Sequence, residues 1–198
     1  MPELTADYWN QRYLTENTPW DLGDVSPAIK HFMDRWTDRQ ARILIPGAGR
    51  AYEAVYLHQQ GFTNVFVCDW APEAFHHLQD QAPDFPKDHQ ITGDFFELDL
   101  RIDLLIEQTF FAAIAPSLRG DYVQQAAKLI RPGGWLVGLL FDGEMNRPGP
   151  PFGASRETYR KLFSNHFTIR ELDTAQHSVA ARRGQEVFVR FQRKDALI

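Results

Sequence analysis

The chain has 198 residues, of which 43% are apolar, so it can bury the core of one globular domain and is neither a disordered nor a collagen-like chain. Its 21 Lys and Arg are outnumbered by 26 Asp and Glu, and the net charge of −5 offers no positive field to a phosphate backbone, so we expect no nucleic-acid partner. Residues 1–10 lack a secretory signal, no window approaches the ~18 apolar residues of a membrane helix, and one cysteine excludes an intramolecular disulfide, so we expect a cytoplasmic protein with no membrane contact.

The first forty residues are rich in aromatic side chains. Aromatic residues make up 13% of the chain, with five Trp and fifteen Phe, which exceeds what a core of this size ordinarily needs. The N-terminal ones include Trp9, Tyr13, Trp20, Phe32 and Trp36. A segment of this length cannot bury a core of its own, so we expect 1–40 to pack as a helical lid on a single domain spanning 1–198.

From residue 41 onward, short aliphatic runs alternate with helix-like stretches, which is typical of a parallel sheet with crossover helices. We predict strands at 42–45, 65–68, 90–92, 104–106 and 135–141, and helices at 52–60, 72–81 and 117–130. The strands are nearly continuously apolar, which indicates that helices cover both faces of the sheet. The fold class is therefore α/β, doubly wound and mostly parallel.

The last third of the chain changes pattern. Arg131-Pro-Gly-Gly stops the preceding helix, and Ser155 is placed to cap a further helix at 155–163. Two segments with alternating apolar residues follow, at 167–172 and 186–192, and a polar stretch joins them. We predict that these two segments end the sheet as an antiparallel pair.

The strongest signal for a ligand is a hydrophobic strand that runs into a Pro-Gly-Ala-Gly turn at 46–49 and then into a helix. Gly47 and Gly49 allow the tight turn and let a ligand approach bare backbone. Asp69 ends the next strand about 20 residues later, where an acid in a doubly wound sheet can bind both ribose hydroxyls. Together these features predict a nucleoside ligand, and a turn that merely joins strand to helix is the alternative.

Tyr52 occupies the position of the third glycine in a dinucleotide-binding motif. A bulky side chain there hinders both close helix packing and the approach of a pyrophosphate to the helix N-terminus. NAD and FAD are therefore disfavoured, and a nicotinamide-dependent oxidoreductase is the less favoured enzymatic alternative.

Two more acids stand at the ends of predicted strands. Asp94 precedes Phe95 after the third strand, and Glu107 comes shortly before Phe111 at the end of the fourth. An unpaired acid at the end of a buried strand would cost several kcal/mol, so we expect both acids to face a ligand at the topological switch point of the sheet. For the phenylalanines, ordinary core packing is the alternative to a ligand contact.

Seven short motifs occur along the chain: Tyr-Trp-Asn at 8–10, Thr-Pro-Trp-Asp-Leu-Gly at 18–23, Pro-Gly-Ala-Gly at 46–49, Val-Cys-Asp at 67–69, Gly-Asp-Phe-Phe at 93–96, Glu-Gln-Thr-Phe-Phe at 107–111 and Gly-Pro-Pro-Phe at 149–152. Because of these motifs, the chain resembles the thiopurine methyltransferase superfamily, which includes thiol and halide methyltransferases. The resemblance covers most of the chain, and the N-terminal tryptophans and the Gly-Pro-Pro-aromatic loop are its most specific parts. It implies S-adenosylmethionine as cofactor and the strand order 3-2-1-4-5-7-6, with the last strand antiparallel.

The resemblance also implies which residues bind the cofactor around the first two strands. Trp9 and Trp20 would line the S-adenosylmethionine pocket. Gly47, within the turn that also holds Gly49, would border the methionine part of the cofactor. Asp69 would bind the ribose.

The third and fourth strands would complete the cofactor pocket. The resemblance implies that Asp94 and Phe95 meet the adenine, and that Glu107 meets the amino-acid portion or forms the pocket floor. The fourth strand ends in Glu-Gln-Thr-Phe, unlike the Asn/Asp-Pro-Pro-aromatic motif of enzymes that methylate nucleobase or glutamine nitrogens. This difference again disfavours a nucleic-acid substrate.

On the acceptor side, the resemblance places Arg119 near the substrate, in a matching Arg-X-X-Tyr context, and we expect Phe152 and Phe111 to line the same pocket. Phe152 replaces a frequent Tyr of the family, and Tyr13 stands where plant relatives carry Trp. These departures leave the acceptor open among thiols, thiopurines, halides and related species.

Methyl transfer from a sulfonium to a thiolate or halide cancels two opposite charges, so a dry, aromatic pocket favours it. A thiol with a pKa near 8.5 is partly ionised at pH 7 and a halide carries no proton, so we assign no catalytic base. The histidines lack the partners and spacing of metal ligands, and we expect no metal. We expect a monomeric enzyme with a small-molecule acceptor, and a sensor or pseudoenzyme that binds the cofactor without turnover is the alternative.

Overall fold

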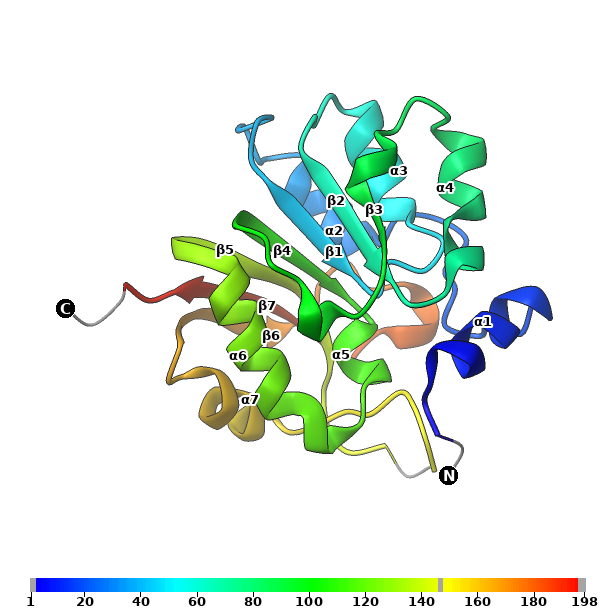
Figure 1. Ribbon diagram of the computed structural model, residues 1–198. Coiled ribbons are helices and arrows are strands. Elements are labelled where there is room, and N and C mark those ends of the chain that lie inside the picture. Colours follow the sequence, from blue (N-terminus) through cyan, green and yellow to red (C-terminus); the bar gives the residue numbers. More distant parts are fainter. Residues whose placement is uncertain (1–2, 146–147, 196–198) are drawn as a thin grey trace.

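The computed structural model describes residues 3–145 and 148–195, which form one seven-stranded sheet with helices on both faces (Figure 1). The strands are β1 (Ile43–Pro46), β2 (Val65–Asp69), β3 (Gln90–Thr92), β4 (Ile102–Gln108), β5 (Ile130–Phe141), β6 (Phe167–Thr174) and β7 (Glu186–Arg193). Their order in the sheet is β3-β2-β1-β4-β5-β7-β6. Strands β1 to β5 run parallel, and β7 is antiparallel to both β5 and β6. The α/β class, the strand order and the antiparallel pair are thereby confirmed.

The helices form one layer on each face of the sheet (Figure 1). One layer holds α2 (Pro27–Met33), α3 (Tyr52–Gln59) and α4 (His76–Gln81), and the other holds α5 (Phe110–Ala113), α6 (Arg119–Leu129) and α7 (Arg156–Phe163). The part of the chain that the structure describes also contains the short 3-10 turns η1 (Pro72–Phe75), η2 (Lys87–His89), η3 (Phe95–Glu97), η4 (Pro116–Leu118) and η5 (Ala180–Arg182). None of the helices within the described ranges is long and apolar enough to cross a membrane.

Among the described residues, the two large apolar cores lie one under each helix layer. Side chains of successive residues in the central strands point into opposite cores. In β1, Ile43 and Ile45 pack under α2 and α3, whereas Leu44 packs under α5 and α6. Every residue of β1 is buried, as expected for a strand that is covered on both faces.

The boundaries of some elements differ from the predicted ones for local reasons. The predicted helix 72–81 divides into η1 and α4, and the predicted helix 117–130 begins with η4 before α6. Strand β5 begins at Ile130 because Ile130 already pairs with Ile102 of β4, across an irregularity in the register. Ser155 caps α7 as predicted, since its Oγ accepts from the Thr158 N–H at 3.2 Å.

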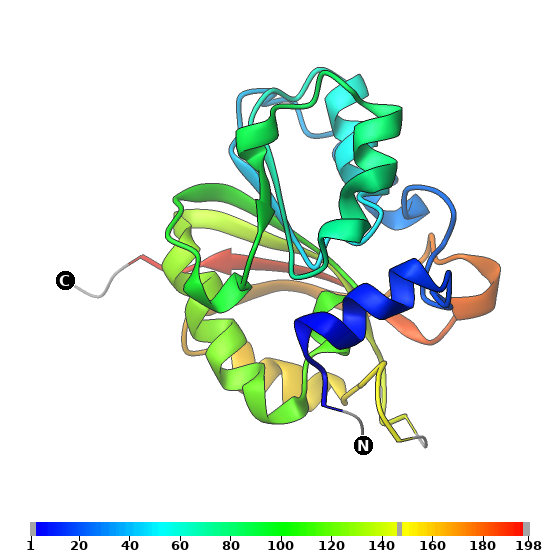
Figure 2. The same cartoon turned by 45° about the vertical axis from the view of Figure 1, so that its right-hand side comes forward.

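The N-terminal helix α1 (Ala6–Leu14) belongs to neither layer. It lies across the end of the sheet and contacts η1, which follows β2 (Figure 2). The carboxyl ends of parallel strands meet at one edge of a sheet, and it is this edge that α1 covers.

Candidate cofactor and acceptor site

The turn after β1 is built from left-handed backbone. Gly47 and Gly49 have φ angles of 55° and 53°, and Ala51 follows with 56° directly before α3. A β-carbon on Gly47 would lie 2.3 Å from the ring of Phe110, which packs against the turn from the start of α5. Both its dihedral angle and this close ring therefore require glycine at position 47.

Asp69 ends β2, and its carboxylate accepts from two backbone N–H groups. Oδ2 accepts from Gly49 at 3.0 Å, and Oδ1 accepts from Ala71 at 2.9 Å. Burial raises the pKa of this carboxyl, while the N–H donors act in the opposite direction because they stabilise its charged form. The structure thus brings Asp69 to the glycine turn, and each of its oxygens has a second lone pair that can accept a further donor.

Aromatic residues of the N-terminal segment lie directly over the turn. The Tyr13 hydroxyl is 3.0 Å from where a β-carbon of Gly49 would be. Trp20 meets the Tyr13 ring edge-on at a centroid distance of 6.0 Å, and Trp9 meets Trp20 at 5.4 Å. Burial, and next the charge of Asp69, raise the pKa of Tyr13 well above its ordinary value. The N-terminal tryptophans therefore lie near the edge of the sheet to which the sequence assigns the cofactor.

Charged side chains hold this segment in place. Asp21 pairs with Arg50 at 2.8 Å, which ties the 18–23 motif to the residue after Gly49. The Arg182 Nη2 donates to the carbonyl oxygen of Trp20 at 2.7 Å, so the loop before β7 also contacts the N-terminal segment. This segment is thus fixed from both halves of the chain.

Asp94 follows β3 and caps the turn η3, because its Oδ1 accepts from the Phe96 N–H at 2.9 Å. The Gly93 N–H donates to the Asp69 carbonyl oxygen at 3.0 Å, which keeps the two acidic residues at neighbouring strand ends. The Cys68 thiol donates to the Gly93 carbonyl, and burial raises its pKa to about 12, so it is a buried structural thiol. Within residues 3–145 and 148–195, no three His, Cys, Asp or Glu side chains gather at one point.

Glu107 is bonded within the protein and does not reach the surface. Its side chain is fully buried, its Oε1 accepts from the Phe111 N–H at 2.8 Å, and its Oε2 accepts from the Tyr122 hydroxyl at 2.6 Å. These donors offset the cost of burying the acid, so Glu107 does not need a ligand to satisfy its charge, which corrects the expectation that its side chain faces the amino-acid portion of a ligand. The carboxylate instead fixes the start of α5, from which Phe110 packs against Gly47. That Glu107 forms the floor of the pocket stays a prediction.

The pKa of Glu107 predicts a pH-dependent free energy of unfolding. Burial raises this pKa from 4.5 to about 7, although the bonds from Tyr122 and Phe111 act in the opposite direction. Between these values the folded protein keeps a proton that the unfolded chain has released, so stability falls as the pH rises through about 7. The slope reaches at most ~1.4 kcal/mol per pH unit.

Urea unfolding at a series of pH values between about 5 and 8 measures this effect. Glu107→Gln lacks the carboxyl group that titrates. We therefore expect its free energy of unfolding to fall less with rising pH than that of the native protein. Equal pH dependence in the two proteins would contradict the raised pKa.

Phe95 and Phe111 belong to the core. They are 2% and 1% exposed, and both rings pack on Tyr122, at centroid distances of 5.2 Å and 4.9 Å. This corrects the expectation that their rings form pocket walls, because no ring surface is left for a ligand. The other aromatic residues predicted to line the pocket stay half-buried: Trp9, Trp20 and Phe152.

The three residues predicted on the acceptor side come together. The Arg119 guanidinium lies 5.0 Å from the centroid of Phe111, and its Nη2 donates to the carbonyl oxygens of Phe152 at 2.8 Å and Gly153 at 3.3 Å. The Phe152 N–H donates to Ala112 at 2.7 Å, so the loop is held at two points. Burial lowers the pKa of Arg119, and its Nε has no hydrogen-bond partner in the described part of the chain.

The sequence pointed to Tyr122 only as the last residue of the Arg-X-X-Tyr context and assigned it no role, and it did not point to Arg182 at all. Tyr122 holds Glu107 and stacks on Phe95, and it lies on the buried face of α6 together with Val123 and Ala126. Helical periodicity could therefore have indicated it. Arg182 lies in the polar stretch between the last two strands, where no local pattern distinguishes it from its neighbours.

Solved methyltransferases share this fold. The 1,6-didemethyltoxoflavin-N1-methyltransferase of Burkholderia thailandensis matches with a TM-score of 0.75 and 18% identity, over 97% of this chain and 88% of that chain. Magnesium protoporphyrin IX methyltransferase from Synechocystis PCC 6803 matches with a TM-score of 0.72 and 15% identity, over 96% of this chain and 95% of that chain. The protein therefore has the fold of the S-adenosylmethionine-dependent methyltransferases.

The family follows from the sequence. The model of the thiopurine S-methyltransferase family matches residues 4–197, so the chain belongs to this family. The resemblance seen in its motifs is thereby confirmed, and S-adenosylmethionine is its cofactor, as expected.

Relatives within this family carry several names. "Probable thiol methyltransferase 2" of Arabidopsis thaliana is 29% identical over 98% of this chain and 88% of its own length. "Thiocyanate methyltransferase 1" of the same organism is 25% identical over 93% of this chain and 84% of its own. "Thiopurine S-methyltransferase" of Pseudomonas fluorescens is 26% identical over 86% of this chain and 87% of its own. These relatives belong to one family but are named for different methyl acceptors, so their names do not identify a single acceptor.

Proposed function

We propose that the protein methylates a small soft nucleophile, such as a thiol, with S-adenosylmethionine as the methyl donor. The observation that carries this proposal is membership of a family whose matched relatives are named for a thiol, thiocyanate and thiopurine, each of which offers sulfur. Half-buried aromatic rings near the glycine turn and an arginine under the Pro/Gly loop give the proposal structural support.

The residues at the ends of β1 to β3 fit the cofactor. Gly47 and Gly49 present backbone without β-carbons, and Asp69 has lone pairs for two ribose hydroxyls beyond the N–H groups that it already holds. Asp94, at the neighbouring strand end, would accept from the adenine amino group. When bound, S-adenosylmethionine supplies a methyl group on a positively charged sulfur.

The N-terminal segment would act as the lid of this site. The Trp9 and Trp20 rings would attract the positive sulfur by cation–π contact, which contributes ~0.5–2 kcal/mol depending on desolvation. They would also exclude water, which favours a reaction in which a soft anion must lose its hydration. Such a closed site would also align the two reactants, which is the other large contribution to the rate of methyl transfer.

On the acceptor side, Arg119 would favour an anionic nucleophile near the Phe152 loop. A thiol with a pKa near 8.5 is partly ionised at pH 7, so a positive charge that stabilises the thiolate is sufficient to supply the anionic nucleophile. Glu107 is not placed to remove a proton from an acceptor, because both of its oxygens are bonded inside the core. The reaction would therefore proceed without a general base.

A panel of acceptors tests the proposed function. The protein with S-adenosylmethionine is incubated with thiols, thiopurines, halides, thiocyanate and chalcogen oxyanions, and both S-adenosylhomocysteine and the methylated product are measured by mass spectrometry. We expect product from at least one sulfur acceptor. Cofactor binding without any product would favour the sensor, and a melting temperature raised by NAD but not by S-adenosylmethionine would favour the oxidoreductase.

Arg119→Ala and Phe152→Ala are expected to raise the KM of the acceptor and to leave the Kd of S-adenosylhomocysteine unchanged. Loss of a hydrogen bond from a charged group costs about 1.5–3 kcal/mol, so the KM should rise roughly tenfold or more for Arg119→Ala. Steady-state kinetics and calorimetry measure the two quantities. Arg160→Ala, an exposed arginine on α7, is the matched control. A weaker cofactor Kd with an unchanged acceptor KM would reverse this assignment.

A further inference from the structure

A cavity lies between α2 and the outer strands of the sheet, and the residues of the glycine turn do not line it. Its volume is about 530 Å³, which is within the ~300–1,000 Å³ of small-molecule sites. His31 and Phe32, at the end of α2, line one side of the cavity together with Arg35 and Trp36 from the turn that follows this helix. This is a concave site of ligand size that the methyl-transfer function does not use.

Aromatic rings form the walls of this cavity. Phe32 lies 5.7 Å from Trp36 and 5.9 Å from Phe188 of β7 between ring centroids, and Trp135 of β5 completes the set. All four rings are half-buried, whereas the aromatic rings of the core under α6, such as Phe111, are buried. Part of the aromatic surplus of the sequence therefore lines this cavity.

Two of the lining side chains each carry a buried donor without an acceptor. Trp36 Nε1 and Arg190 Nε have no hydrogen-bond partner among residues 3–145 and 148–195. Indole and guanidinium nitrogens can only donate, so what both lack is an acceptor. Buried donors are rarely left unpaired in native proteins, and both nitrogens are closed to solvent, so an acceptor bound in this cavity would satisfy them once the two side chains turn toward it.

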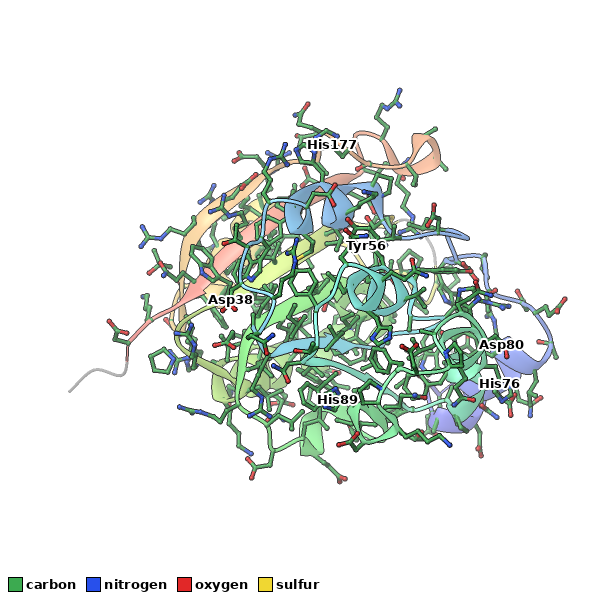
Figure 3. All side chains as sticks on the ribbon, turned by 90° about the horizontal axis from the view of Figure 1, so that it is seen from above. Asp38, Tyr56, His76, Asp80, His89 and His177 are labelled. Atoms are coloured by element: carbon green, nitrogen blue, oxygen red, sulfur yellow. The ribbon has the colours of Figure 1, made fainter. Side chains whose placement is uncertain are left out.

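The charge of the lining favours an anion. Arg35 and Arg190 outnumber Glu171, which pairs with Arg190 at 3.4 Å, although the chain as a whole carries −5. The Arg190 guanidinium also lies 5.4 Å from the centroid of Trp135, next to the aromatic wall. At one end the rings of His31 and His177 lie 3.9 Å apart, and Figure 3 labels His177 beside α2. A positive group next to aromatic walls is complementary to a flat anion.

We propose that this cavity binds a small aromatic carboxylate, with its ring against the four aromatic walls and its carboxylate accepting from Trp36 and Arg190. A carboxylate supplies acceptors only, matches the planar guanidinium and carries the complementary charge. The site is separate from the methyl-transfer site, so it does not depend on the identity of the methyl acceptor.

Binding of 2-naphthoate to the full chain tests this proposal. Calorimetry with S-adenosylhomocysteine present is expected to give saturable binding at one site, with cyclohexanecarboxylate and the neutral 2-naphthalenemethanol binding at least about tenfold more weakly, because each lacks one of the two recognised features. Nuclear Overhauser contacts should join the naphthalene protons to the indole protons of Trp36 or Trp135. Absence of saturable binding at millimolar probe, or contacts only to other tryptophans, would overturn the proposal.

Substitutions separate this cavity from the methyl-transfer site. Trp36→Phe removes the Nε1 donor and keeps an aromatic ring, and Arg190→Gln removes the charge; each should raise the Kd of 2-naphthoate at least about tenfold and leave methyl transfer unchanged. Arg119→Ala should not alter the Kd. The opposite pattern would place the probe in the acceptor site and refute the assignment. Sedimentation that shows a dimer insensitive to 2-naphthoate, with the cavity closed by a second chain, would also refute it.

Discussion

Glu107→Ala is expected to lower the free energy of unfolding by roughly 2–6 kcal/mol, because it leaves the Phe111 N–H and the Tyr122 hydroxyl buried without an acceptor. Each orphaned donor costs about 1–3 kcal/mol, and the cavity left by the side chain adds to this. The Glu107 carboxylate also holds the start of α5, so Phe110 should pack less firmly against Gly47. Urea unfolding measures the first effect, and calorimetry of S-adenosylhomocysteine binding measures the second.

Two further variants show whether the hydrogen bonds cause this loss. Tyr122→Phe removes one donor and keeps the ring that stacks on Phe95, so it should cost less than Glu107→Ala. Glu107→Gln keeps one acceptor oxygen and the volume of the side chain, and it should be intermediate. A Glu107→Ala protein as stable as the native one would show that the carboxylate contributes nothing in the core. A loss equal in all three variants would assign the effect to packing.

The elements could be predicted from local patterns, but their neighbours in the sheet could not. The helix that ends before Arg131-Pro-Gly-Gly and the cap at Ser155 depend on residues next to each other in the chain, and both are as predicted. Alternation of strands and helices does not state which strands pair, so the order of the sheet came from the family resemblance. Strand β5 begins earlier than predicted because Ile130 pairs with a residue on another strand, which local sequence does not show.

In the site too, residues placed by local sequence were predictable, whereas contacts between distant residues were not. Gly47 and Asp69 were predictable, because a strand end and a fixed spacing place them. The direction of Glu107 was not predictable, because it depends on Tyr122, which α6 brings from the other side of the strand end. An acid that closes a buried strand has the same sequence pattern whether it meets a ligand or a tyrosine, and only packing distinguishes the two cases.

Asp69→Ala is expected to weaken S-adenosylhomocysteine binding by about 10- to 100-fold. The charge-assisted bonds that its carboxylate would make to the ribose contribute about 1.5–3 kcal/mol. The structure adds a second cause, because the same carboxylate accepts from the N–H groups of Gly49 and Ala71 and so fixes the turn that would meet the methionine part. Calorimetry gives the Kd, and the melting temperature reports whether the turn still folds.

Two variants make the test of Asp69 specific. Asp69→Asn keeps one oxygen for a backbone N–H and loses the charge, so an affinity between those of the native protein and Asp69→Ala would separate charge from the support of the turn. Asp80→Ala removes an exposed acid of α4, labelled in Figure 3, and should leave the Kd unchanged. Because the buried carboxylate is desolvated, its bonds to a ligand are worth more than those of a surface acid. A native Kd in Asp69→Ala would mean that the acid at the end of β2 serves only the turn, and the cofactor site would then have to be sought elsewhere along the same edge of the sheet.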